Sequence, residues 1–135
     1  MKYKFLKHTA DIKFQAYGKS LNEVFENSAL AMFKTMSSKK IAEKKSLELK
    51  IREKNLESLF HAFLEKLLIM LDSKNVFLSK IKIRIDEKDN SLIAKIIGDY
   101  ASNYQISLNV KAVTYNDFFL KKDGVHWIAQ VVLDV

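Results

Sequence analysis

An unbroken apolar stripe between Leu56 and Leu71 constrains the fold more than any other feature of this sequence. Its members recur every three or four residues, which is the spacing of one helical face: Leu56, Leu59, Phe60, Phe63, Leu64, Leu67, Leu68 and Leu71. Asn55 stands at the N-cap position, where its side-chain oxygen can accept a hydrogen bond from a free backbone N–H. The pattern predicts a helix from Asn55 to about Ser73, with its apolar face buried.

A second helix is predicted after Gly18. Ser20-Leu21-Asn22-Glu23 has the form of a capping box, in which the serine oxygen accepts from the backbone N–H of Glu23 and the glutamate reaches back. The apolar residues that follow keep the helical spacing: Leu21, Val24, Phe25, Ala29, Met32, Phe33 and Met36. This helix is expected to run to about Ser37.

The remaining sequence alternates apolar with polar residues, which is the period of half-buried strands. Strands are predicted over 2–7, 11–17, the second half of 38–54, 80–86, 92–97, 104–115, 117–120 and 125–133. The order β-β-α-β-α, followed by a run of strands, predicts an α+β fold. In this fold two helices pack on a largely antiparallel β-sheet of about eight strands.

Length and composition limit the class of protein. The 135 residues suit a single domain, 1–135, and no Pro/Gly/Ser-rich linker divides them. No run of about 18 apolar residues occurs, so no membrane role is expected. The N-terminus has no continuous apolar stretch of the signal-peptide kind, so we expect a cytoplasmic protein. The absence of cysteine excludes disulfides, thiolate metal sites and a cysteine nucleophile.

The net charge of +7 suits contact with nucleic acid or with an acidic protein face. However, only Arg52 and Arg84 among the 23 basic residues are arginine, the residue that grips phosphate in a planar, two-point contact. Many of the lysines fall within 39–54, where RNA binding and a merely solvated surface are both open. The aromatic residues argue against RNA binding, since most lie on stripes that face the core.

No enzyme motif is present. The sequence has no glycine-rich nucleotide loop, no G-x-S-x-G and no H-E-x-x-H. The histidines, His8, His61 and His126, are far apart, and His61 is expected to pack beside the apolar stripe. Because no nucleophile stands beside a base in a recognisable setting, covalent catalysis has no candidate.

Two carboxylates are the candidate functional residues. Asp11 precedes a predicted strand, and Asp134 ends the long apolar strand that closes the sequence. That strand should hold Asp134 and the α-carboxylate of Val135 in a fixed place. Carboxylates brought together repel unless neutralised, and a hard cation such as Ca²⁺ or Mg²⁺ does this through oxygen ligands. The alternative is that Asp11 is a turn or cap residue and Asp134 a solvated end.

Motifs along the whole chain resemble those of the archease family. They are His8-Thr9-Ala10-Asp11, Tyr17-Gly18-Lys19-Ser20-Leu21, Lys111-Ala112-Val113-Thr114-Tyr115 and the ending Leu133-Asp134-Val135. The resemblance implies an accessory protein, not itself an enzyme, of the tRNA-splicing RNA ligase that joins 2′,3′-cyclic phosphate and 5′-hydroxyl ends. Such a protein promotes guanylylation and multiple turnover of the ligase, and any contact with tRNA would be indirect.

The resemblance also implies a divalent metal site, seen with calcium, formed by Asp11, Asp134 and Val135. An all-oxygen site suits Mg²⁺ and Mn²⁺ as well. If the α-carboxylate of Val135 is a ligand, the chain is expected to end there. Two other roles stay open: an RNA- or tRNA-binding module, and a chaperone-like partner of a tRNA-modifying methyltransferase. The sequence departs from the family at Asn116, where histidine is common, and in the short stretch 99–103.

Overall fold

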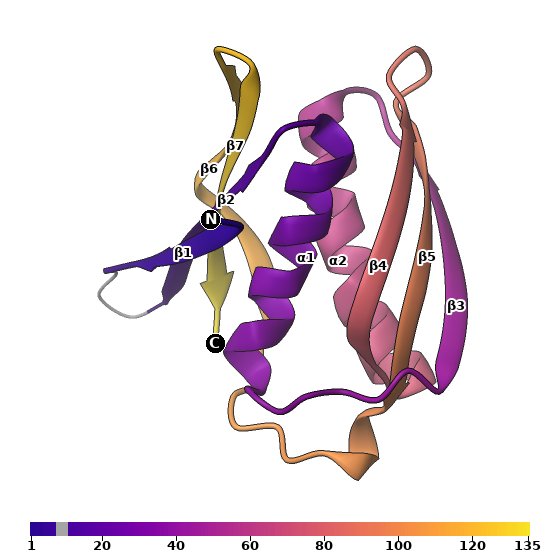
Figure 1. Ribbon diagram of the computed structural model, residues 1–135. Helices are drawn as coiled ribbons and strands as arrows, with labels where there is room; N and C mark the ends of the chain where they lie inside the picture. Colours follow the sequence, from indigo (N-terminus) through magenta and orange to yellow (C-terminus); the bar gives the residue numbers. More distant parts are fainter. Residues whose placement is uncertain (8–10) are drawn as a thin grey trace.

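The structure is a computed structural model that describes residues 1–7 and 11–135. Its elements are β1 (Tyr3–Leu6), β2 (Ile12–Gly18), α1 (Leu21–Met36), β3 (Lys45–Arg52), α2 (Leu56–Lys74), β4 (Val76–Asp86), β5 (Ser91–Tyr100), a 3₁₀ turn (Ala101–Asn103), β6 (Ala112–Asp123) and β7 (His126–Asp134). They form three layers, with the two helices between two sheets (Figure 1).

Both helices begin at the predicted caps. The Ser20 hydroxyl accepts a hydrogen bond from the backbone N–H of Glu23 at 3.1 Å, and the Glu23 carboxylate accepts from the N–H of Lys19 at 3.3 Å. The Asn55 side chain accepts from the N–H of Ser58 at 2.8 Å. α2 ends at Asn75, whose φ of 56° lies in the left-handed region that ends many helices.

Strand pairing is antiparallel throughout the described sheets. One sheet has four strands in the order β1-β2-β7-β6, and the other has three in the order β3-β5-β4. The α+β class, the two helices and the antiparallel pairing are therefore confirmed. In the described part of the chain the strands number seven, and they are divided between two sheets rather than joined in one.

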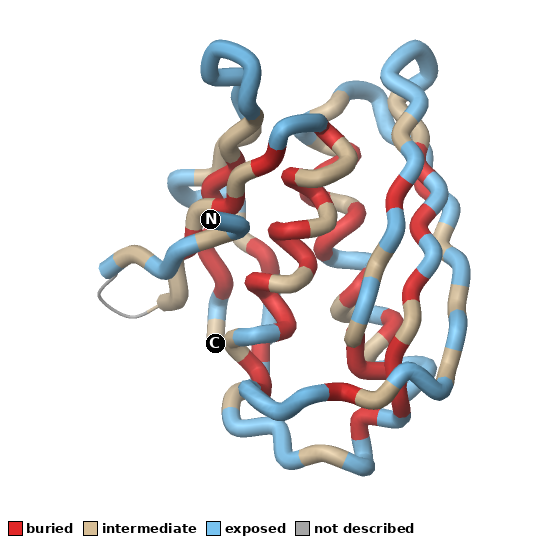
Figure 2. Tube along the Cα trace, in the orientation of Figure 1, coloured by how far each residue is buried: buried red, intermediate tan, exposed pale blue. Residues whose placement is uncertain are grey.

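The division into two sheets follows from how α1 is buried. Its predicted apolar face is buried, and so are Asn27, Ser28 and Ala31 outside that face. A helix packed on one sheet needs only a single apolar stripe, so this wider burial requires cover on two sides. α1 accordingly packs on β2 in one sheet and on β4 in the other, and buried positions line both sides of the helix layer (Figure 2).

The predicted strand over 104–115 is wrong in its first part. Residues 104–111 form no strand, and they carry the chain from β5 in one sheet to β6 in the other. The N–H of Ser107 bonds to the carbonyl of Met36 at 2.8 Å, and the Tyr104 hydroxyl accepts from the N–H of Ala42 at 2.9 Å. The alternation arises because Tyr104 and Val110 anchor an extended connection to the core.

The predicted short strand 117–120 is part of β6, whose pairing with β7 is interrupted between Thr114 and Phe119. Within the described ranges, no helix is long and apolar enough to cross a membrane.

Candidate functional site

The His8-Thr9-Ala10-Asp11 motif is described only in its last residue. His8, Thr9 and Ala10 lie outside the described residues. Asp11 directly precedes β2, as predicted, and is partly exposed. The pairing of β2 with its neighbouring strand therefore determines which residue lies opposite Asp11.

The register of β2 against β7 brings Asp11 and Asp134 to the same edge of the sheet. Ile12 pairs with Leu133 and Lys13 with Val132. Continuing this antiparallel register by one residue places Asp11 opposite Asp134, and residues directly opposite on antiparallel strands project to the same face. Two of the predicted ligands, near opposite ends of the sequence, thus become neighbours.

The Asp134 backbone is held by β6. β7 lies between β2 and β6, and Asp134 pairs with Ala112 of β6. The N–H of Lys111 donates a hydrogen bond to the carbonyl of Asp134 at 2.8 Å. Val135 follows, and its partly buried side chain packs against the core. The final strand thus reaches Asp134 and holds its backbone against β6. We call Asp11, Asp134 and Val135 the carboxylate edge.

The donor set at this edge suits a hard cation. Among the residues that the structure describes, no three His, Asp or Glu side chains gather into a metal-binding group. Side chains of the carboxylate edge supply two carboxylates, and a third donor would be the α-carboxylate of Val135. Adjacent carboxylates repel one another, and Ca²⁺ or Mg²⁺ relieves this through oxygen coordination. The residues present therefore fit a divalent cation.

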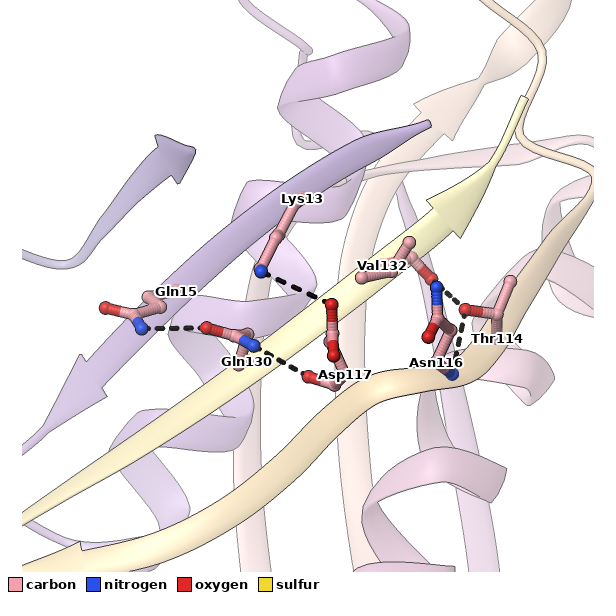
Figure 3. A network of polar contacts seen from close by, with 7 residues as sticks. All are labelled: Lys13, Gln15, Thr114, Asn116, Asp117, Gln130 and Val132. Carbon is pink, nitrogen blue, oxygen red and sulfur yellow. Dashed lines mark hydrogen bonds and ion pairs between the residues drawn. The ribbon is translucent and has the colours of Figure 1, made fainter. Parts of the chain in front are cut away.

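A polar network covers the outer face of the four-stranded sheet beside this edge (Figure 3). Gln15 donates from Nε2 to Oε1 of Gln130 at 2.9 Å, and Gln130 donates from Nε2 to the backbone carbonyl of Asp117 at 2.8 Å. Lys13 Nζ lies 3.5 Å from the Asp117 carboxylate. Asp117 has a φ of 53°, so these contacts hold an unusual backbone position in place.

This network was missed by sequence reasoning. The available signal was that Lys13 and Gln15 fall on the polar face of a predicted strand. Their partner Asp117 could not be found, because it faces them only through the irregular pairing of β6 with β7 between Thr114 and Phe119.

The Lys111–Tyr115 motif joins β6 to β7 and to α2. The Thr114 hydroxyl donates to the carbonyl of Val132 at 3.2 Å, and it accepts from the N–H of Asn116 at 3.3 Å (Figure 3). Tyr115 stacks on the ring of His61 with centroids 3.9 Å apart. The motif thus ties the strand beside Asp134 to α2.

His61 packs as expected from its place beside the apolar stripe. It is buried, with Nε2 2.8 Å from the carbonyl oxygen of Val113 and Nδ1 3.1 Å from the Glu65 carboxylate. Both ring nitrogens face acceptors, and a neutral imidazole can donate to only one of them. These contacts give His61 a role in fixing α2 against β6.

Comparison with known proteins decides the family. The sequence matches the Archease protein family over residues 3–135.

The chain belongs to the archease family.

Relatives of known name support the assignment along the whole chain. The archease of Sulfurisphaera tokodaii is 37% identical over 137 residues, covering 99% of each chain. The archease of Methanosarcina mazei is 39% identical over 140 residues, covering 99% of this chain and 96% of its own. The resemblance inferred from the motifs is therefore confirmed.

Solved structures share the fold. A Methanobacterium thermoautotrophicum protein known from its solution structure superposes with a TM-score of 0.86 at 33% identity, covering 99% of both chains. An archease from Thermotoga maritima, described as a possible chaperone, has a TM-score of 0.66 at 22% identity, covering 98% of this chain and 96% of its own. The archease fold accounts for both sheets and both helices.

Proposed function

We propose that this archease is a non-catalytic, cytoplasmic activator of the tRNA-splicing RNA ligase, which joins 2′,3′-cyclic phosphate and 5′-hydroxyl RNA ends. It would promote guanylylation of the ligase, so that each ligase molecule completes many rounds. Family membership and the intact motifs at both ends of the chain support the proposal. The observation that carries it is the pairing of Ile12 with Leu133, which aligns Asp11 with Asp134.

The proposed cofactor is a divalent cation held by the carboxylate edge, with Ca²⁺ the first candidate and Mg²⁺ or Mn²⁺ the alternatives. When bound, the cation would offset the repulsion between carboxylates and offer positive charge to a phosphate group. The backbone of Asp134 is held by β6, and the preceding residue, Leu133, also pairs with β2. Such preorganisation favours binding, because little freedom remains to be lost.

The chain's own residues would act by positioning. The carboxylate edge would dock transiently at the ligase active site and orient the groups that take part in guanylyl transfer. Phosphoryl-transfer rates depend mainly on positioning and on stabilisation of developing charge, so an accessory protein can accelerate the step without reacting. This agrees with the absence of a nucleophile–base motif in the sequence.

A chaperone-like role for a tRNA-modifying methyltransferase is the second candidate. It is favoured by the description of the Thermotoga maritima archease as a possible chaperone. Both candidates require a protein partner, so affinity purification with tagged protein separates them. Recovery of the ligase supports the first proposal, and recovery of a methyltransferase without the ligase supports the second.

The direct test is ligase guanylylation with labelled GTP, measured with and without this protein. With GTP in excess over the ligase, the proposal expects the ligase to be guanylylated faster when this protein is present. An unchanged rate at saturating protein would contradict it.

A further inference from the structure

Two neighbouring pockets lie between β1 and the C-terminal half of α1. The first is a pocket of about 270 Å³ lined by residues that include Lys2, Tyr3 and Lys34. The second is a pocket of about 440 Å³ lined by residues that include Phe5, Lys7 and Lys34. Since Lys34 lines both pockets and β1 runs along both, we treat them as one feature, the β1 groove.

The β1 groove is rich in exposed lysine side chains. They come from two segments far apart in sequence, residues 2–7 and 34–40: Lys2, Lys7, Lys34, Lys39 and Lys40. Within residues 1–7 and 11–135, the ion pairs involve none of these five lysines. Unneutralised positive charges gathered along a concave surface attract a polyanion.

Two aromatic residues of β1 lie between Lys2 and Lys7 in the sequence. Tyr3 lines the first pocket, and Phe5 lines the second with 48% of its surface exposed. The two rings lie edge to face with centroids 5.6 Å apart. Flat rings beside cationic side chains are the combination that single-stranded nucleic acids bind, since bases stack on the rings while phosphates contact the cations.

We propose that the β1 groove binds single-stranded RNA, with its lysines on the phosphates and with Tyr3 and Phe5 stacked against bases. An acidic peptide would satisfy the lysines, but it has no bases to lie on the two rings. Sequence reasoning weighed the aromatic residues against RNA binding, whereas the structure leaves Phe5 exposed and Tyr3 partly exposed in pockets that lysines line.

One end of the β1 groove lies at Asp11 of the carboxylate edge. Asp11 lines the second pocket, so a strand entering past Lys39 and Lys40 would lead toward the carboxylate edge. RNA binding in the groove extends the proposed function, and it rests on that function only in that the RNA would be the ligase substrate. Binding itself can be measured without the ligase.

The experiment is fluorescence anisotropy with a labelled oligouridylate of about 12 nucleotides, a length within the range that such grooves accommodate. Wild-type protein should bind, and the affinity should fall as salt rises, with a log–log slope of about −0.7 for each neutralised phosphate. The double variant Lys39→Glu with Lys40→Glu should lose at least about tenfold in affinity and show a flatter salt dependence.

A matched control carries the same change in net charge elsewhere. Lys82 and Lys95 are exposed and pair with each other across β4 and β5, away from the groove. Lys82→Glu with Lys95→Glu should change the affinity less than about threefold if local contacts dominate over general attraction. An equal loss in both double variants would overturn the proposal.

The aromatic contribution is tested separately at Phe5. Phe5→Ala should weaken binding about tenfold and leave the salt dependence unchanged, because the ring carries no charge. Phe5 also packs edge-on against Phe14 with centroids 6.4 Å apart, so Phe5→Leu, which keeps apolar packing but removes the flat ring, serves as the second variant. Wild-type affinity in Phe5→Leu protein would overturn the stacking.

Competition and ligase assays separate the remaining outcomes. Polyglutamate that displaces the RNA as well as unlabelled oligouridylate does would overturn RNA in favour of an acidic protein. RNA binding without ligase activation would support the groove and contradict the proposed function. Ligase activation by protein that binds no RNA would overturn the groove alone.

Discussion

Ile12 of β2 pairs with Leu133 of β7, and the residues that follow this pair toward the sheet edge are Asp11 and Asp134. This pairing joins segments from opposite ends of the sequence, and it brings two carboxylates that are distant in sequence together as one candidate site. Metal binding at this site stays a prediction, and the first measurements concern it.

Removing either carboxylate should weaken Ca²⁺ binding. We expect Asp11→Asn and Asp134→Asn each to lower the affinity at least about tenfold, since each loses one charged oxygen ligand. Calorimetric titration measures this directly. Ca²⁺ at about 100 times its dissociation constant should also stabilise wild-type protein by about 2.7 kcal/mol.

The control for these variants is Asp72→Asn, an exposed carboxylate on α2. It should bind Ca²⁺ like wild type. Equal affinities for all three variants and wild type would show that Ca²⁺ binds elsewhere or not at all.

The third ligand is tested by adding one glycine after Val135. The extension moves the α-carboxylate away from the carboxylate edge and leaves every side chain in place. We expect weaker Ca²⁺ binding with no loss of thermal stability in the metal-free protein. Unchanged affinity would remove Val135 from the site and leave the two aspartates.

Acid should destabilise the protein partly through Asp99. Its buried carboxylate accepts a hydrogen bond from the Tyr104 hydroxyl at 2.8 Å, and this bond, with the N–H of Tyr100, holds the pKa of Asp99 below its usual 3.8. A pKa lowered by folding means that the unfolded state binds protons more readily. The stabilisation is therefore present above about pH 4 and is lost as the pH falls through the folded-state pKa.

Asp99→Asn removes that titration. The variant should be less stable than wild type at neutral pH, and the difference should narrow as the pH falls from about 5 to about 3. Urea unfolding at several pH values measures the free energy of unfolding of both proteins. A constant difference between them across this pH range would show that the interactions of Asp99 do not depend on its charge.

Gly98 should tolerate no side chain. A Cβ built there would lie 1.9 Å from the carbonyl oxygen of Phe77, a backbone atom that cannot move aside cheaply. Gly98→Ala should destabilise the protein by about 3 kcal/mol or should prevent folding. Gly124→Ala is the comparison, because nothing lies within 4 Å of its Cβ and only the φ of 63° opposes it. Denaturant midpoints that rank the two variants in the reverse order would contradict this account.

Local spacing was enough to predict the helices. The stripe that includes Leu59, Phe63 and Leu67 specifies both the helix and its buried face, and the caps Ser20 and Asn55 are read directly from the sequence. The division of the strands into two sheets was not predictable in this way. It depends on pairings between distant segments, and alternation over 104–110 looks the same in a strand as in an anchored connection.

The candidate site was predictable only in part. Asp134 stands out as a carboxylate at the end of an apolar strand, and a cation site shared with Asp11 and Val135 was one of two interpretations that the residues left open. The family resemblance favoured it. The contacts of Asp117 with Lys13 and Gln130 could not be foreseen, because they arise where β6 departs from regular pairing.

The central claim is that the carboxylate edge makes this archease an activator of the RNA ligase. The most direct test counts ligation events per ligase molecule in the presence of wild-type, Asp134→Asn or Asp72→Asn protein. The account predicts many events with wild-type and Asp72→Asn protein, and about one event per ligase with Asp134→Asn protein, on the order of a single turnover. Multiple turnover with Asp134→Asn protein equal to that with wild type would contradict it.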